Sequence, residues 1–363
     1  MYVAPTMKQR VSQRDLARLA GVSPMTVSLA LRGHPSIPLE TRQRISELAH
    51  QHHYRPDPAL AALNAYRVSS SKKQFQGVIG WLTYFPTRTG WREMIQMEGY
   101  YRGACAKAEQ YGYQLEDFWM AEPGLTPARA TQILLARGVR GLIIAPLPKP
   151  HSVIHLDWRH FAVVTLGYSL AEPHLHVVMN HQSRNMKHTV HRLFALGYRR
   201  VGLAMPSAND ERVDHNYLGG YLVAQCELPP GTARLEPLLA PHFTSSVFRG
   251  WFERERPDAV IASAGSAYQV KEWLKADGIA VPKQVGLAVA ATPFGDTTLS
   301  GMNEDVNMVG GMAVDAVVGM IHSIEQGVPV RPWSLLTEGV WFPGKTARKK
   351  TPAKRKAAGA KGP

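Results

Sequence analysis

The stretch DLARLAGVSPMTVSLALRGHP (residues 15–35) contains two short apolar repeats separated by a Gly-Val-Ser-Pro break. Ser12 lies just before the first repeat and is a good N-cap, and Gly21 follows it and ends a helix well. The spacing i, i+3, i+4 places the apolar side chains of this repeat on one face of a helix: Leu16, Leu19 and Ala20. We therefore expect a first helix between Ser12 and Gly21.

A second helix is predicted to begin at once, with Ser23 as N-cap and Pro24 as its first residue. Its inward face is formed by Val27, Ala30 and Leu31. The remaining side chains point away from that face: Pro24, Met25, Ser28, Leu29 and Arg32. A third helix, from about Leu39 to His52, covers the other two with Ile45, Leu48 and Ala49.

Two short helices joined by a tight, Gly-containing turn are typical of a helix-turn-helix motif. The second helix of such a motif stands free of the core, so that the side chains at its start can enter the major groove of DNA. The structural alternative is a small three-helix bundle that serves only for packing.

The segment VSQRDLARLAGVSPMTVSLALRGHPSIPLETRQRISELAHQHHYRPDP (residues 11–58) resembles the DNA-binding domain of the lactose-repressor (LacI/GalR) family. The resemblance rests on the pattern Asp15, Ala17, Ala20, Gly21, Val22, Ser23, Thr26, Val27, Ser28, Thr41, Arg42, Ile45 and Tyr54-Arg55-Pro56. It implies that Pro24, Met25 and Leu29 reach base edges. Other residues are expected near phosphates or at the DNA-facing caps: Ser12, Ser23, Thr26, Ser28 and Arg32.

The three expected base-reading residues are apolar and cannot donate paired hydrogen bonds. Arginine contacts to guanine are therefore not available from them, and contact with thymine methyl groups is the remaining way to read the major groove. We expect a preference for thymine at the positions that Pro24, Met25 and Leu29 face.

The resemblance also implies a hinge helix in residues 57–74, which inserts a leucine into the minor groove. Leu63 matches that leucine. The usual arginine of the family is Ala61 here, and Asn64 or Arg67 can take its place. A linker with a nascent helix is the alternative.

From Phe75 onward, short apolar runs alternate with amphipathic stretches: GVIGWLTYF, GVRGLIIAP, FAVVTLGY, RVGLAMP, DAVIASAG and VGLAVAA. This rhythm predicts parallel sheets with helices on both faces, over a length sufficient for two lobes. The order of these segments resembles the family's core, which is similar to a periplasmic sugar-binding protein. The predicted fold class is thus α/β, with a three-helix domain (residues 1–56), a hinge (57–74), a two-lobed core (75–344) and a disordered basic tail (345–363).

Ligands of open parallel sheets bind beyond the carboxyl ends of the strands. By that rule the expected effector contacts are Tyr84, Phe85, Trp91, Tyr168, Ser169, Asn180, His181, Arg212 and Asn216. Two sugar-binding elements of the family are replaced, by Ser263-Ala264-Gly265 and by Ala291-Thr292. Three alternatives stay open: an effector other than an ordinary sugar, a sugar bound by other groups, or a vestigial site.

The net charge of +14 is unevenly distributed. Residues 1–73 carry +7 and residues 345–363 carry +8, so the part between them is nearly neutral. This asymmetry indicates a polyanionic partner at the ends of the chain. For the tail, phosphate contact and a solubilising extension are both open.

No secretory signal and no run of 18 apolar residues is present, so we expect a cytoplasmic protein. Scattered histidines such as those in HSVIHLDWRH (residues 151–160) lack the motifs of metal or catalytic sites, and we expect neither an enzyme nor a cofactor. Cys105 and Cys226 fit buried, reduced thiols.

The sequence as a whole predicts a transcriptional regulator, a repressor, that binds a pseudo-palindromic operator as a homodimer and responds to a small molecule. A periplasmic-type binding protein without a regulatory role is the alternative.

Overall fold

The computed structural model describes residues 11–31, 33–34, 36–52, 54 and 75–350. The chain divides into two compact units. Unit 1 consists of Met1–Met179 and Val306–Leu335, and unit 2 of Asn180–Asp305 and Leu336–Pro363. The chain therefore passes between the units three times, so each unit is built from segments that lie far apart in the sequence.

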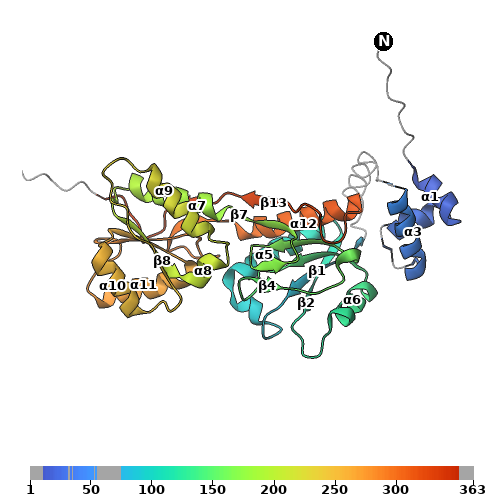
Figure 1. The fold of residues 1–363 in the computed structure, drawn as a ribbon, viewed down its shortest axis with the longest axis horizontal. Coiled ribbons are helices and arrows are strands. Elements are labelled where there is room, and N and C mark those ends of the chain that lie inside the picture. The colour runs from blue at the N-terminus through green and yellow to red at the C-terminus, as the bar shows by residue number, and fades with distance from the viewer. Residues whose placement is uncertain (1–10, 32, 35, 53, 55–74, 351–363) are drawn as a thin grey trace, which may run out of the picture. The chain divides into compact units, whose positions relative to one another are not determined.

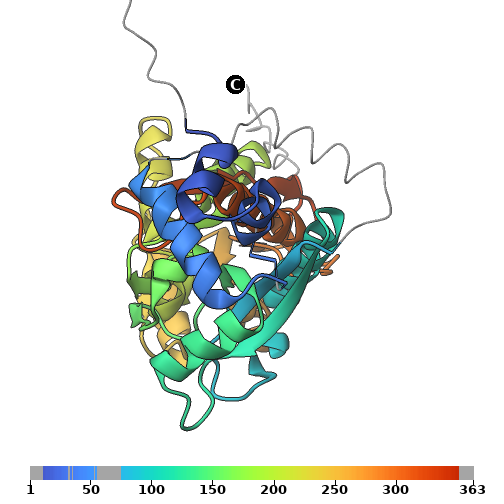
Figure 2. The ribbon, with the colours of Figure 1, turned by 90° about the vertical axis from the view of Figure 1, so that its right-hand side faces the viewer.

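Three helices, coloured blue in Figure 1 and Figure 2, form the N-terminal part: α1 (Gln13–Ala20), α2 (Pro24–Leu31) and α3 (Leu39–Gln51). The predicted caps of α1 are confirmed. The Ser12 hydroxyl accepts the Asp15 N–H at 3.3 Å, and the Asp15 carboxylate accepts the Ser12 N–H at 2.9 Å. Gly21 ends the helix in the left-handed region with φ 62°, where a side chain would be strained.

The three helices bury one small apolar cluster whose central residues are Leu16, Val27 and Ile45, each fully buried. One inward residue was predicted wrongly. Leu19 is 52% exposed, whereas Ala17 is buried, because the face of α1 that meets the other helices is centred on residues 16, 17 and 20. The small side chain of Ala17 lets the helices approach closely at this point.

The sheet of unit 1 has the strand order β13-β7-β5-β3-β1-β2, and the neighbours from β7 to β2 run parallel. Its strands are β1 (Gly77–Thr83), β2 (Tyr113–Trp119), β3 (Val139–Ile144), β5 (Ala162–Leu166), β7 (His176–Asn180) and β13 (Ser334–Thr337). The small pair β4 (Ser152–Val153) and β6 (Leu170–Glu172) lies apart from it. The helical elements are η1 (Gly90–Glu93), α5 (Ile95–Gln110), α6 (Pro127–Ala136), η2 (Trp158–His160) and α12 (Val306–Ser323).

Helices cover both faces of this sheet, as predicted for buried parallel strands (Figure 1). Helices α5 and α12 pack on one face, and α6 packs on the other. Within the described part of the chain, α12 alone is long and apolar enough to cross a membrane by composition. Half of this helix is buried inside the molecule, and Val309, Val314 and Val317 are fully buried in the unit 1 core, as expected for a core helix.

Unit 2 repeats the design, with the strand order β14-β12-β11-β10-β8-β9. All neighbours are parallel except β12 and β14. The strands are β8 (Val201–Pro206), β9 (Leu238–Ala240), β10 (Ala259–Ala262), β11 (Gly286–Val289), β12 (Ser300–Asn303) and β14 (Val340–Phe342). Helices α7 (Gln182–Ala195) and α9 (Asn216–Glu227) pack on one face, α10 (Ser245–Glu255) and α11 (Ala264–Ala276) pack on the other, and α8 (Ser207–Glu211) follows β8.

One of the buried carboxylates of unit 2 belongs to Glu304. Glu304 accepts hydrogen bonds from the side-chain amides of Asn180 (2.8 Å) and Asn185 (3.2 Å). The Thr337 hydroxyl donates to the Asn180 carbonyl oxygen at 2.8 Å, and the Gly339 N–H donates to that of Asn185 at 2.9 Å. Burial raises the pKa of Glu304 to about 7, although both amides act in the opposite direction.

Two further expectations differ from the structure. Cys226 is exposed and only Cys105 is partly buried, because residue 226 lies on the outer face of α9.

The segment expected to be a disordered tail from residue 345 is hydrogen-bonded to unit 2 as far as Lys350. The Leu287 N–H donates to the Thr346 carbonyl at 2.8 Å, and the Lys350 N–H donates to the Leu196 carbonyl at 2.7 Å. Residues 351–363 lie outside the described residues.

Replacing Glu304 with Gln should remove one pH-dependent contribution to stability. The carboxyl group binds its proton up to about pH 7 in the folded protein but loses it near pH 4.5 when unfolded, so folding stability falls as the pH rises between these values. The fall is on the order of 2–3 kcal/mol. Thermal unfolding of wild type and Glu304→Gln from pH 5 to pH 8 measures it. Glu253→Gln, at an exposed position of the same unit, is the control. Parallel pH curves for wild type and Glu304→Gln would contradict the assignment.

Candidate nucleic-acid interface and ligand site

The start of α2 is fixed by Ser23, as predicted. Its hydroxyl accepts the Thr26 N–H at 3.0 Å and lies 2.8 Å from the Thr26 hydroxyl, while its carbonyl accepts the Val27 N–H at 3.1 Å. These bonds satisfy donors that the first turn of a helix otherwise leaves unpaired. The position of Pro24 and Met25 is therefore set by the backbone.

The two sides of α2 differ sharply in exposure. Val27 and Ala30 are buried in the cluster of the three helices, whereas Pro24 is exposed and Met25 is 65% exposed. Leu29 is half-buried, as are Thr26 and Ser28. The most exposed side chains at the start of α2 are thus the apolar Pro24 and Met25, beside the polar cap Ser23. Three further predicted DNA contacts, Arg32, Leu63 and Asn64, lie outside the described residues.

Helix α3 supports this arrangement through two arginines that the sequence analysis gave no role. Arg44 donates to the Ala20 carbonyl at 3.0 Å, at the end of α1, and Arg42 donates to the Gly33 carbonyl at 3.0 Å, just beyond α2. Both carbonyls belong to helix ends, which lack partners within the helix. The sequence signal that could have identified these two contacts is the presence of basic residues on the outer side of the third predicted helix.

Four of the nine predicted effector contacts have buried side chains. Trp91 is fully buried and packs edge-on against Tyr101 at 5.0 Å between ring centroids, and Phe85 is 7% exposed in the same core. The Ser169 hydroxyl accepts the Leu147 N–H at 2.8 Å. Asn180 is engaged with Glu304, as described above. These four side chains have structural roles here, which sequence position alone did not reveal.

The other five are half-buried and remain candidates: Tyr84, Tyr168, His181, Arg212 and Asn216. Tyr84 directly follows β1, and its hydroxyl is buried without a hydrogen-bond partner in the described protein. Burial also raises the pKa of this phenol. His181 caps α7, with its Nδ1 3.5 Å from the Arg184 N–H.

Arg212 and Asn216 flank a junction between α8 and α9 that is organised by Asp210. This carboxylate is fully buried and accepts from the Leu218 N–H at 2.9 Å, and the His215 Nδ1 lies 2.9 Å away. The hydrogen bond to Asp210 raises the pKa of His215. Asp214 and His215 both have positive φ, 53° and 55°, a strained conformation for residues with side chains. The junction is held by Asp210, which the sequence analysis missed.

A second missed group lies where β10 ends. Ser263 and Ser266 form a capping box at the start of α11, and their hydroxyl oxygens are 2.7 Å apart. The Asn209 amide donates to Ser263 at 2.7 Å. The same Ser263 was noted in the sequence as a departure from the family pattern. In the structure its hydroxyl caps a helix and binds a neighbouring amide.

No group of three His, Cys, Asp or Glu side chains that could hold a metal ion occurs in the part of the chain that the structure describes. In the histidine-rich segment 151–160, His160 lies 3.3 Å from Asp157, whose carboxylate also binds Arg159 at 2.9 and 2.8 Å. Arg159 and His160 thus share one carboxylate, as in an ion-pair cluster near the surface.

Two family models match the chain. Residues 12–57 match "Bacterial regulatory proteins, lacI family", and residues 190–338 match "Periplasmic binding protein-like domain". The first contains all of α1, α2 and α3, and the second contains most of unit 2. No curated protein is similar enough in sequence to count as a relative.

Several solved structures share the fold. A complex of the transcriptional regulator CelR with cellobiose has a TM-score of 0.55 and 16% identity, covering 93% of this chain and 100% of that one. A lac repressor dimer bound to operator and the anti-inducer ONPF has a TM-score of 0.52 and 17% identity, covering 94% and 100%. A glucose-bound regulator, CCPA from Weissella paramesenteroides, has a TM-score of 0.54 and 14% identity, covering 75% and 98%. At these identities the likeness establishes the fold.

Met25→Ala and Leu29→Ala should change which DNA sites the protein prefers. Met25 is 65% exposed, so its truncation removes surface that can contact a thymine methyl group without opening a cavity. We expect the advantage of thymine-bearing sites to fall by about 1 kcal/mol, a several-fold change. Competition between duplexes that differ in one thymine measures it.

The matched control is Leu19→Ala, which truncates a leucine that is 52% exposed on α1. It should leave the ranking of duplexes unchanged. If Met25→Ala and Leu29→Ala also leave the ranking unchanged, these residues do not read bases.

Proposed function

Because this chain belongs to the lacI family of bacterial regulatory proteins, we propose that it is a transcriptional repressor that binds a pseudo-palindromic operator as a homodimer. The observation that carries the proposal is the start of α2, where a side-chain cap and a buried inner face leave Pro24 and Met25 accessible. A helix presented in this way can place its first residues in the major groove. Two copies related by symmetry would read two half-sites.

The proposed contacts divide by chemistry. Pro24, Met25 and Leu29 read base edges through apolar contact, and the polar residues near them bind phosphates: Ser12, Ser23, Thr26, Ser28 and Arg32. The hinge remains part of the proposal, with Leu63 as the residue that enters the minor groove and Asn64 beside it. The domain limits 1–56 and 57–74 are kept as proposed limits, and the core, proposed to begin at residue 75, extends to at least Lys350.

The core is proposed to bind a small-molecule effector of the carbohydrate class. Support comes from solved structures of the same fold, of which one is a complex with cellobiose and another has bound glucose. The half-buried candidates Tyr84, Tyr168, His181, Arg212 and Asn216 combine aromatic rings with hydrogen-bonding groups, as sugar sites do. The effector acts on DNA affinity only through its different affinities for the two states of the protein.

A regulator of this family performs no chemical step, so we propose no enzymatic activity, and we place the protein in the cytoplasm with its DNA. A periplasmic-type binding protein without a regulatory role is not favoured, because the lacI family match covers residues 12–57. A binding protein without a regulatory role would not need the helices α1–α3.

The experiment that tests the proposal is a selection of random and genomic duplexes on the purified full-length chain at near-physiological salt. We expect enrichment of a pseudo-palindrome with thymines at the positions facing α2. Ser23→Ala, which removes the cap of α2 at a cost of about 1 kcal/mol, should weaken retention of the enriched site. Retention without any sequence preference, both alone and with added cell extract, would contradict the proposal.

Effector binding is tested on the enriched site. A panel of mono- and disaccharides is added, and release or tighter retention of the duplex is measured. We expect at least one sugar to change the affinity several-fold, and Arg212→Ala to reduce that response. Ser169→Ala, at a buried and structurally engaged hydroxyl, is expected to lower stability instead. A panel without any response would contradict the carbohydrate class.

A further inference from the structure

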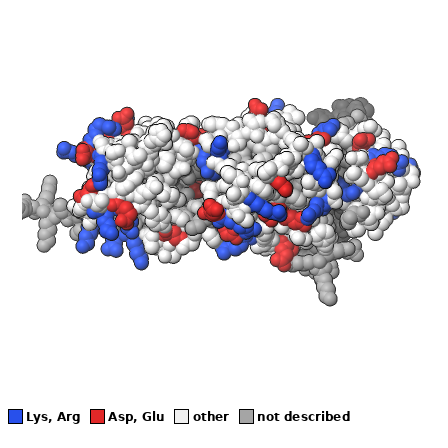
Figure 3. Space-filling model, turned by 90° about the horizontal axis from the view of Figure 1, so that it is seen from below, with Lys and Arg blue, Asp and Glu red and all other residues white. Residues whose placement is uncertain are grey.

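Lysine and arginine gather on one part of unit 2, at the left of Figure 3. Segments 192–200 and 345–350 together contain seven Lys or Arg and no Asp or Glu. The structure brings these two segments into contact: the Lys350 N–H donates to the Leu196 carbonyl at 2.7 Å, and the Arg348 N–H donates to the Tyr198 hydroxyl at 3.2 Å. Cations from two distant parts of the sequence thus share one surface.

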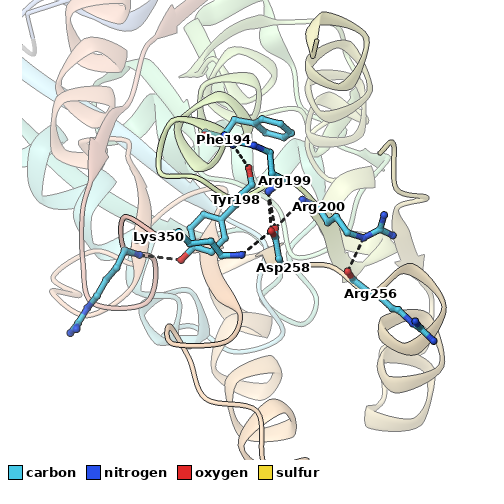
Figure 4. Close-up of polar contacts among 8 residues, drawn as sticks. Phe194, Tyr198, Arg199, Arg200, Arg256, Asp258 and Lys350 are labelled. Atoms are coloured by element: carbon cyan, nitrogen blue, oxygen red, sulfur yellow. Dashed lines mark hydrogen bonds and ion pairs between the residues drawn. The ribbon is translucent and has the colours of Figure 1, made fainter. Parts of the chain in front are cut away.

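A single carboxylate, Asp258, lies at the centre of this surface (Figure 4). Its oxygens accept the backbone N–H of Arg199 (2.9 and 3.1 Å) and of Arg200 (2.9 Å), and also the Nζ of Lys350 (2.8 Å). The negative charge of Asp258 is therefore shared between peptide groups and one lysine. It forms no ion pair with either guanidinium group.

Both guanidinium groups are instead bound by neutral carbonyl oxygens. Arg199 donates to the carbonyls of Phe194 (3.0 Å) and Tyr198 (2.8 Å). Arg200 donates through Nε to the Arg256 carbonyl at 2.9 Å and through Nη2 to the Glu255 carbonyl. These bonds fix the two groups in position but do not neutralise them. The two guanidinium groups therefore keep their positive charge and are held in a fixed position.

Three more cations extend the surface into solvent. The side chains of Arg256, Arg348 and Lys349 are exposed, and the guanidinium group of Arg256 points away from Asp258 in Figure 4. Among the described residues, none of these three has an ion-pair partner within 4 Å. We name the five residues Arg199, Arg200, Arg256, Arg348 and Lys349 the basic end surface. Besides Asp258, the acids near Arg256 along the chain are Glu253 and Glu255 on α10, and Glu255 is bound by Arg254 at 3.0 Å.

We propose that the basic end surface binds the phosphate backbone of duplex DNA, as a contact separate from the helices α1–α3. Fixed guanidinium groups flanked by exposed cations match the regular row of phosphates on a duplex. The contact carries no sequence information, because phosphates are the same at every base pair. It raises the affinity for DNA in general and steepens the dependence of that affinity on salt.

Duplex DNA fits this surface better than single-stranded RNA. Proteins that bind single strands stack the bases on exposed aromatic rings. Of the rings beside the basic end surface, Tyr198 is fully buried and Trp251 is 2% exposed. The half-buried ring of Phe194 is already paired with the Arg199 guanidinium group, 5.6 Å from its centroid. What the surface offers to a ligand is charge and hydrogen-bond donors.

The test compares two triple variants of the full-length chain on a short duplex of arbitrary sequence. The first, Arg256→Asn with Arg348→Gln and Lys349→Gln, removes the exposed cations and leaves the hydrogen-bonded Arg199 and Arg200 in place. Asn is chosen at residue 256 because its φ of 45° is a conformation that Asn tolerates. The control, Arg88→Gln with Arg129→Gln and Lys149→Gln, removes the same charge from exposed positions in unit 1.

Fluorescence anisotropy between about 50 and 200 mM salt gives the slope of log affinity against log salt. We expect the first variant to flatten this slope by about 2 to 3, since each phosphate contact contributes about 0.9, and the control by less than about 1. Equal slopes for the two variants would overturn the proposal. So would tighter binding of single-stranded RNA or polyglutamate than of the duplex. Because the duplex contains no selected site, this outcome is independent of operator recognition by α1–α3.

Discussion

The carboxylate of Glu304 ties together the three places where the chain passes between its units. Asn180 lies just after the first passage, Glu304 just before the second and Thr337 just after the third. A carboxylate without water needs hydrogen-bond donors at both oxygens, and here each oxygen receives one amide. The positions of the three segments within unit 2 are therefore coupled. Glu304 directly follows β12 and Asn185 lies in the first turn of α7, so this hydrogen bond links the end of β12 to the start of α7.

Much of the N-terminal part could be predicted from the sequence, because its signals are local. Caps, a left-handed glycine and a helical repeat act over three or four residues, and Ser12, Gly21 and Ser23 behave as their types suggest. Leu19 was predicted wrongly for a non-local reason. The face of α1 that becomes buried depends on where α2 and α3 pack. A helix of two turns has too few apolar residues to specify that face from the sequence. The parallel sheets were likewise predictable, because strands buried on both faces are almost purely apolar.

The surroundings of the predicted ligand contacts could be predicted only in part. Position after a strand places a residue at the correct edge of a sheet, but it does not say whether the side chain turns outward or joins the core. Trp91 and Phe85 turn into the core of unit 1, where burial of large rings stabilises the fold. The side-chain amide of Asn180 is hydrogen-bonded to the carboxylate of Glu304, 124 positions away in the sequence. Asp210 was missed because its partners His215 and Leu218 are set by the irregular junction between α8 and α9. The cap formed by Ser263 was missed although a serine directly after a strand is a common helix cap.

The C-terminal segment of unit 2 is attached along its length until Lys350. Thr346 and Ala347 are buried and bonded to Ser300, and Lys350 reaches both Asp258 and, at 4.9 Å, the ring of Tyr198. This attachment decides where the protein can be modified by engineering. A reporter or affinity tag joined beyond residue 350 keeps every one of these bonds, whereas a fusion that replaces residues 345–350 removes the bonds of Thr346 and Ala347 to Ser300 and the ion pair of Lys350 with Asp258. The fusion point is therefore chosen beyond Lys350, the last residue of unit 2 that the structure describes.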